Sequence, residues 1–193
     1  MAAEYGPLYS FSPPTKPRQR LSMTQFKHLQ QHYMTIYELA SLHDPELVNM
    51  ENNVQIWYRC TVDKTDYHST LYQRSNSTRI NNLVCIEHTV DANANYSYRV
   101  RPEHMIPLEF YAYVQFYCVH AFREAPQMLM YSKYRKIRIH DGLVEDLRHH
   151  CDGFQDIRVL QHLYARVTAT EGKTYFVDEK EVMEKRLRDA LVD

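Results

Sequence analysis

The stretch between Pro107 and Ile139 constrains the fold most, because its side chains alternate with a period of two over much of its length. One alternating set consists of Phe110, Ala112, Val114, Phe116 and Cys118. The other set consists of Tyr111, Tyr113, Gln115 and Tyr117. This is the period of a β-strand, whose successive side chains point to opposite faces of a sheet. A turn at residues 124–126 leads into a second strand at residues 128–139, so the stretch predicts a long antiparallel hairpin.

The sequence before this hairpin predicts one helix and several shorter strands. Residues 22–42 carry apolar side chains at spacings of three and four, which indicates an amphipathic helix; a short turn followed by a strand is the alternative. Strand-like alternation recurs at residues 54–62, 80–90 and 96–100. The first twenty residues are rich in proline and polar side chains, so we predict a flexible leader there.

The spacing of apolar residues changes from two to about 3.6 after His140. This change predicts a helix from Asp141 to Val167, with Asp141 as its N-cap and a break near Gly153. A short apolar piece at residues 175–177 follows, and a charged helix is expected from Asp178 onward. The order of elements is therefore a helix, roughly five strands and a further helix.

Composition narrows the function classes. The chain of 193 residues has a formal net charge of -1, so any affinity for nucleic acid has to come from a local basic face or from base stacking. Only 4 glycines disfavour phosphate-cradling loops, whereas 16 tyrosines favour β-structure and binding surfaces. The four cysteines contain no CxxC pair, which gives no support to a zinc ribbon, and no apolar run approaches the length of a membrane span.

These observations predict a mainly β (α+β) fold, a five-stranded antiparallel OB-type barrel with a C-terminal helix. Residues 1–20 are expected to be the Pro-rich leader, and residues 21–168 the OB-fold domain with its C-terminal helix. Residues 169–193 are expected to form a C-terminal extension with a short helix.

The last hairpin and the segment after it carry a resemblance to a known family. Residues 110–122, the turn at residues 123–127, the return strand at residues 128–139 and the segment His140–His150 resemble the end of the OB domain in the middle subunit of replication protein A and its telomeric relatives in CST-type complexes. Residues 23–29 and 54–62 are similar to the family's N-terminal turn and first barrel strand. The family's glycines are missing at residues 58–60 and 87–93.

The resemblance implies a nucleic-acid site on the barrel. Phe122 and Tyr98 match the aromatic positions on which bases stack, and the alternative is that Phe122 caps the core and Tyr98 is an ordinary strand residue. The candidate contacts to the phosphate backbone are Arg79, Arg99, Arg101, Lys133, Arg135, Lys136 and Arg138. The last four share one strand with tyrosine, as a phosphate-tracking groove requires; the alternative is that they protect a sheet edge from aggregation.

The resemblance also implies that the C-terminal helix packs against partner subunits. The expected seam consists of Leu143, Leu147, Phe154, Leu160, Leu163 and Val167. Part of this stripe would have to cover the barrel's own end instead.

Catalytic and metal-binding functions find little support in the sequence. No GxSxG, HExxH or P-loop motif occurs, so we expect no enzymatic activity and no cofactor. His28 and His32 have a spacing that a metal can use, but no acid or cysteine partner stands nearby in the sequence, so no metal is expected.

The resulting hypothesis is a nuclear OB-fold subunit of a complex that binds single-stranded DNA or protects telomere ends on the chromosome. Its expected partners are single-stranded DNA and the other subunits of a telomere-capping or replication-protein-A-like complex, with no membrane. A module that binds only proteins is the alternative, and a small hydrolase or nuclease is a third, disfavoured reading because no carboxylates cluster in the sequence.

Overall fold

The computed structural model describes residues 3–4, 9–12, 17–72, 82–91, 105–140, 143–168 and 174–178. Its helical elements are α1 (Met23–Ile36), α2 (Pro45–Val48) and the 3-10 turn η2 (Ile157–Val159). Its strands are β1 (Ala3–Glu4), β2 (Tyr9–Phe11), β3 (Gln19–Arg20), β4 (Asn53–Trp57), β5 (Arg59–Val62), β6 (Thr65–His68), β7 (Leu83–Asp91), β8 (Met105–Phe122), β9 (Ala125–His140), β10 (Leu143–Asp156), β11 (Leu160–Thr168) and β12 (Thr174–Asp178). The fold is mainly β, as the sequence predicts.

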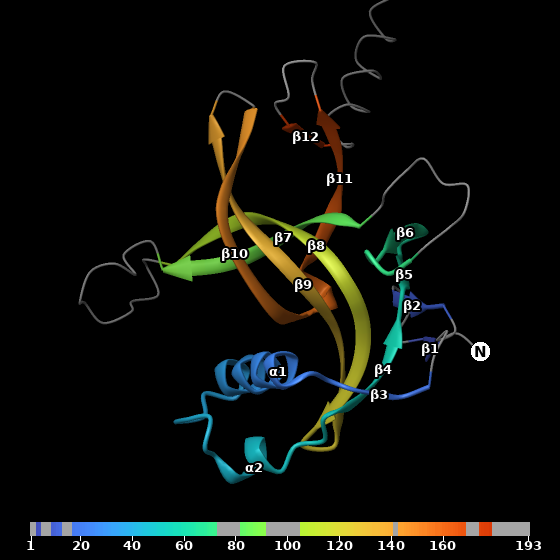
Figure 1. Cartoon of the computed structure of the whole chain (residues 1–193), viewed down its shortest axis with the longest axis vertical. Helices are drawn as coiled ribbons and strands as arrows, with labels where there is room; N and C mark the ends of the chain where they lie inside the picture. The colour runs from blue at the N-terminus through green and yellow to red at the C-terminus, as the bar shows by residue number, and fades with distance from the viewer. Residues whose placement is uncertain are drawn as a thin grey trace, which may run out of the picture.

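The strands form two antiparallel sheets. The larger one has the order β10-β9-β8-β7-β11-β12, with β4 paired to β8 and β3 paired to β4. The smaller one has the order β1-β2-β5-β6. Strand β8 is long and bent, and one of its edges carries β7 along its first half and β4 near its end (Figure 1). Strands β10 and β12, at the two ends of the larger sheet's order, come close to each other.

The predicted long hairpin is confirmed as β8 and β9, which are joined so tightly that Phe122 pairs with Ala125. The faces of β8 differ from the prediction, because a bulge between Val114 and Phe116 places an extra residue on this strand. A single extra residue moves every following side chain to the other face. Val114 therefore packs into a first core cluster between the two sheets, whereas Phe116 packs into a second cluster beneath α1.

The first helix is confirmed over Met23–Ile36, shorter than the predicted range. It begins with a capping box, in which the Ser22 hydroxyl accepts a hydrogen bond from the backbone N–H of Gln25 and the Gln25 side chain accepts one from the backbone N–H of Ser22. Its buried residues Leu29 and Tyr33 pack against the sheet. The helix therefore covers the part of the sheet where β8 turns into β9 (Figure 1).

The predicted helix over Asp141–Val167 is wrong in the described residues, where the chain forms β10, η2 and β11 instead. His140 pairs with Leu143, so only Asp141 and Gly142 connect β9 to β10. An Asp-Gly pair between two strands is a strong hairpin signal, and the sequence interpretation took its aspartate for a helix cap. The apolar piece at residues 175–177 belongs to β12, and residues 179–193 of the predicted last helix lie outside the described residues.

Part of the predicted leader pairs with the sheets. Strand β2 pairs with β5, and β3 pairs with β4. The side chain of Phe11 is fully buried and stacks on Trp57, with ring centroids 5.1 Å apart. An aromatic ring of this size removes enough apolar surface from water to hold a short strand in place, in spite of the prolines around it.

Two hairpins turn on residues other than glycine. Val62 pairs with Thr65 and Phe122 pairs with Ala125, so each turn has two central residues. These residues have positive φ angles, 45° and 68° at Asp63 and Lys64 in the first turn. Such turns favour Asn-Gly or Asp-Gly, because a side chain at positive φ crowds the backbone. The small number of glycines therefore leaves backbone strain in both turns.

We expect Lys64→Gly to raise the free energy of unfolding by about 0.5–1 kcal/mol, because glycine removes this crowding at a positive φ. Urea denaturation followed by circular dichroism measures the change. The matched control is Lys27→Gly, at an exposed position of α1, which should lower the free energy of unfolding by about 1 kcal/mol. A loss of stability in Lys64→Gly would contradict the argument from strain.

Candidate functional site: a basic strand and a groove beside the first helix

Four of the seven basic residues predicted to contact phosphate lie on β9, whose residues 129–135 have a paired strand on each side. It pairs with β8 on one side and with β10 on the other. Edge protection by lysine applies only to a strand with an unpaired edge. This excludes edge protection as the explanation for Lys133 and Arg135, whereas Lys136 and Arg138 lie beyond the residues of β9 that pair with β8, so that explanation still applies to them.

Lys133, Arg135, Lys136 and Arg138 share this strand, and the register gives three of them known backbone neighbours. Lys133 pairs with Tyr113 of β8 and with Asp152 of β10. Arg135 pairs with Tyr111 and His150, and Arg138 pairs with Glu145. The side chains of Lys133 and Tyr113 are both partly exposed. Tyrosine and lysine therefore stand next to each other across the β8–β9 pair.

Phe122 does not lie at the surface. Its side chain is 5% exposed and stacks on Tyr33 of α1, with ring centroids 4.5 Å apart and an angle of 16° between the rings. The structure thus agrees with the alternative that this ring belongs to the core. The other residues assigned to the site, Tyr98, Arg99, Arg101 and Arg79, lie outside the described residues.

The predicted partner seam is divided between two strands and two core clusters. Leu143 and Leu147 lie on β10, and Leu163 and Val167 lie on β11. Phe154 is buried beneath α1 against Tyr131. Leu160 is buried in the cluster between the sheets. A continuous seam requires one helix, whereas the structure places these residues on two strands with a turn between them.

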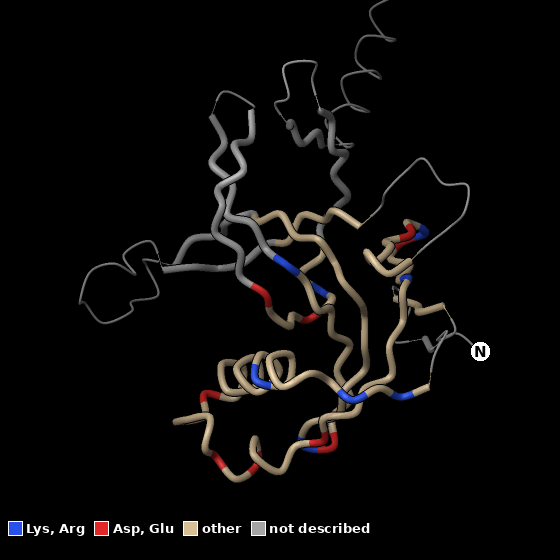
Figure 2. The backbone as a smooth tube through the Cα atoms, in the orientation of Figure 1, with Lys and Arg blue, Asp and Glu red and all other residues tan. Residues whose placement is uncertain are grey.

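The structure also has a groove that the sequence interpretation missed. It lies between α1 and the end of β10 and has a volume of about 470 Å³. Its lining residues are His28, Gln31, His32, Thr35, Ile36, Asp152, Gly153, Phe154, Gln155, Asp156 and Val159. Figure 2 shows acidic positions in red on the chain segment that faces α1 here. The i, i+4 spacing of the two histidines indicates the wall of this groove that α1 forms. The residues of the other wall are far away in the sequence.

The two histidines of the groove, His28 and His32, differ in their hydrogen bonding. His28 Nδ1 lies 3.2 Å from the hydroxyl oxygen of Tyr131. The Nε2 atom of His32 is buried and has no hydrogen-bond partner among the residues that the structure describes. Burial lowers the pKa of His32 to about 4, and the negative charge of Asp156 offsets only part of this effect. His32 is therefore neutral at pH 7.

A third histidine anchors α1 to the sheet. His120 Nε2 donates to the carbonyl oxygen of Glu51 at 2.8 Å, since a carbonyl can only accept. Its Nδ1 accepts from the hydroxyl of Tyr33 at 3.0 Å. Burial lowers the pKa of His120, opposed by the hydrogen bond to Glu51. This neutral ring joins three parts of the chain. It contacts α1 through Tyr33 and the segment before β4 through Glu51, and His120 itself lies on β8.

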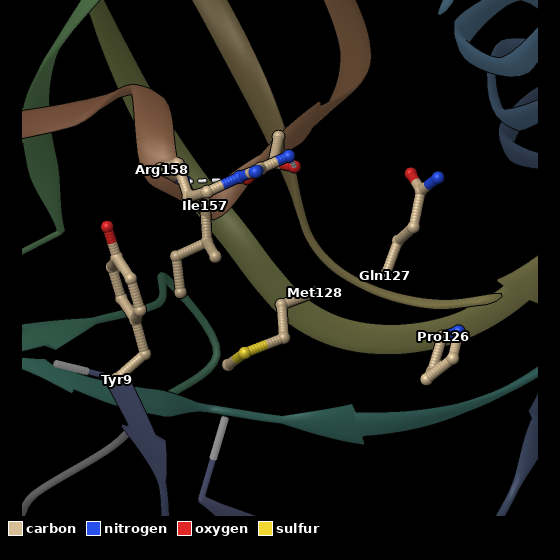
Figure 3. Close-up of a pocket in the computed structure, with 7 residues that line it drawn as sticks. Tyr9, Pro126, Gln127, Met128, Ile157 and Arg158 are labelled. Atoms are coloured by element: carbon tan, nitrogen blue, oxygen red, sulfur yellow. Dashed lines mark hydrogen bonds and ion pairs between the residues drawn. The ribbon is translucent and has the colours of Figure 1, made fainter. Parts of the chain in front are cut away.

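A second, smaller hollow of about 200 Å³ lies next to η2. Figure 3 shows Tyr9 and Arg158 on one side of it and Pro126 and Gln127 on the other, with Met128 and Ile157 between them. The guanidinium of Arg158 is 2.5 Å from the carboxylate of Asp156. Asp156 lines both hollows. Its negative charge is paired with Arg158.

Neither a metal site nor a membrane helix is found in the described part of the chain. No group of three histidine, cysteine or acidic side chains there is placed to hold a metal ion. No helix there is long and apolar enough to cross a bilayer. No family model, curated protein or solved structure matches the chain.

Proposed function

We propose that the protein is a non-enzymatic OB-type subunit of a complex that binds single-stranded DNA or protects chromosome ends. The proposed DNA-binding surface is the β8–β9 face. The single observation that carries the proposal is the position of Lys133 and Arg135 on β9 between β8 and β10, which removes edge protection as the reason for these two basic residues. The bend of β8 and the approach of β10 to β12 are what a sheet curling toward a barrel requires.

The chemistry of this face supports binding to a single strand. Lys133 pairs in register with the partly exposed Tyr113, which places a cation next to an aromatic ring. Single strands are held by cations that follow the phosphates and by rings that stack on the bases. In the proposed complex, other subunits would supply the rest of the binding surface.

An oligonucleotide titration tests this proposal. We expect an oligo-dT strand of about 16 nucleotides to bind the full chain at low salt, with an affinity that falls as salt rises. Replacing Lys133, Arg135, Lys136 and Arg138 together by alanine should reduce the affinity at least roughly tenfold. It should also flatten the salt dependence, by about 0.7 in the slope for each phosphate that the variant no longer neutralises. Fluorescence anisotropy of the labelled strand measures both effects.

Lys64→Ala is the matched control, because Lys64 is an exposed lysine in a turn of the smaller sheet. It should bind the oligonucleotide as the unaltered chain does. If the unaltered chain fails to bind at low salt, or if the fourfold variant binds as well as the control, the DNA-binding part of the proposal is wrong.

A module that binds only proteins is the second candidate. Two observations favour it, namely the burial of Phe122 and the acidic residues of the groove beside α1. A buried ring is not available for base stacking, and carboxylates repel phosphate. This candidate predicts no change in the anisotropy of the labelled strand at any salt concentration.

A further inference from the structure

The groove between α1 and β10 has the size and lining of a binding site for side chains. Its volume of about 470 Å³ lies within the usual range of ligand pockets. Phe154 is buried at the groove against Tyr131 and Phe116, so this wall is firmly packed. Gly153 next to it carries no side chain that would narrow the opening.

The rim of the groove leaves apolar surface in water. Ile36, the last residue of α1, is 48% exposed, and Val159 on the opposite wall is partly exposed. Covering such surface is favourable because it removes apolar area from water. An apolar side chain of a partner, placed between Ile36 and Val159, would complete the packing that Phe154 begins.

The charges of the groove select the partner. Asp152 and Asp156 are its ionisable acids, and no lysine or arginine is among its described lining residues. Asp156 is paired with Arg158, whereas no ion pair of Asp152 occurs in the part of the chain that the structure describes, although Lys133 lies opposite it on β9. Asp152 is therefore the carboxylate that remains for a cation from outside, and a phosphate backbone is disfavoured here.

We propose that this groove binds a segment of a partner polypeptide in which an apolar side chain stands next to a lysine or arginine. The apolar side chain lies between Ile36 and Val159, and the cation pairs with Asp152. This site adjoins the proposed DNA-binding face, because Asp152 pairs in register with Lys133, but the proposal does not depend on DNA binding.

Two matched peptide pools test the proposal on the full chain. In the first pool of short fluorescent peptides, leucine or phenylalanine is flanked by lysine or arginine; in the second, glutamate or aspartate replaces the basic residue. We expect the basic pool to bind at least roughly tenfold more tightly than the acidic pool, as measured by anisotropy. Equal binding of the two pools, or binding of neither, overturns the proposal.

Variants then locate the site. Asp152→Lys should reverse the preference toward the acidic pool, and Ile36→Ser should weaken the basic pool roughly threefold to tenfold. Leu71→Ser is the matched control for Ile36→Ser, because Leu71 is also exposed, at 52%, and lies outside the groove. An unchanged preference in Asp152→Lys overturns the proposal, provided that thermal unfolding shows the variant to be folded.

The oligo-dT titration separates this proposal from the proposed function. Ile36→Ser should bind oligo-dT as the unaltered chain does, and the fourfold β9 variant should keep its preference for the basic pool. Loss of peptide binding in the β9 variant, with the groove residues intact, would place the peptide on β9 and overturn the assignment to the groove.

Discussion

Phe122→Ala is expected to lower the free energy of unfolding by about 3–5 kcal/mol, because it leaves a cavity in the packed core beneath α1. The Phe122 ring is 5% exposed. It stacks on Tyr33 and lies against Tyr37, with ring centroids 4.5 Å and 5.2 Å away. Urea denaturation followed by circular dichroism measures the loss, and the midpoint should fall without a large change in slope.

Two variants give this measurement its controls. Phe122→Leu keeps most of the apolar volume and should cost clearly less than Phe122→Ala. Met23→Ala removes a side chain that is 83% exposed and should change the stability by less than about 0.5 kcal/mol. If Phe122→Ala kept its stability but lost affinity for oligo-dT, the ring would act at the surface as a stacking platform, contrary to the structure.

Lowering the pH from 7 to 4 is expected to destabilise the fold by about 2–3 kcal/mol through His32 alone. Its pKa is lowered from 6.5 to about 4 by burial, so the folded state holds fewer protons than the unfolded state between these values. The stabilisation by neutral His32 is therefore complete above pH 6.5 and is lost as the pH falls toward 4. His120, whose pKa is also lowered by burial, acts in the same direction.

The comparison that isolates this effect is His32→Gln, which cannot take up a proton in this range. The free energy of unfolding, measured between pH 7 and pH 4, should fall less steeply in this variant than in the unaltered chain. His43→Gln, at an exposed position, controls for the loss of an imidazole. Parallel curves for His32→Gln and the unaltered chain would contradict the burial of His32.

The parts of the fold that the sequence predicts are those with local signals. The β8–β9 hairpin follows from alternation and a tight turn, and α1 follows from its apolar stripe. The bulge near Gln115 has no such signal, because Val114 and Phe116 are apolar on whichever face they lie. The faces of β8 were therefore mispredicted beyond the bulge.

The segment after His140 shows how two local signals compete. Its apolar residues fit the spacing of a helix, whereas Asp141 and Gly142 fit a two-residue hairpin connection. The edge of β9 that faces away from β8 decides between helix and strand. Its backbone groups gain hydrogen bonds when the segment pairs with it as β10. That edge exists only once the β8–β9 hairpin is formed, so it cannot be seen in the local pattern.

The sequence predicted only the part of the candidate site that lies on a single strand. The basic residues of β9 are close in sequence, and the hairpin keeps them together. The groove joins His28 of α1 to Asp152 of β10, residues that only the folded sheet brings to opposite walls of one hollow. The burial of Phe122 likewise depends on Tyr33, which a strand pattern around Phe122 does not contain.

Strands β7 and β4 share one edge of β8, and this arrangement affects how the chain folds during synthesis. Gln55 pairs with Val119, and Tyr33 of α1 needs both His120 and Phe122. Strand β4 and helix α1 therefore leave the ribosome before β8, against which they pack, has been made, with their apolar surfaces uncovered. Long-range pairing of this kind folds slowly and exposes strands to aggregation. Fragments that end before β8 should accordingly be insoluble or unfolded, whereas chains that extend through β9 can close the core beneath α1.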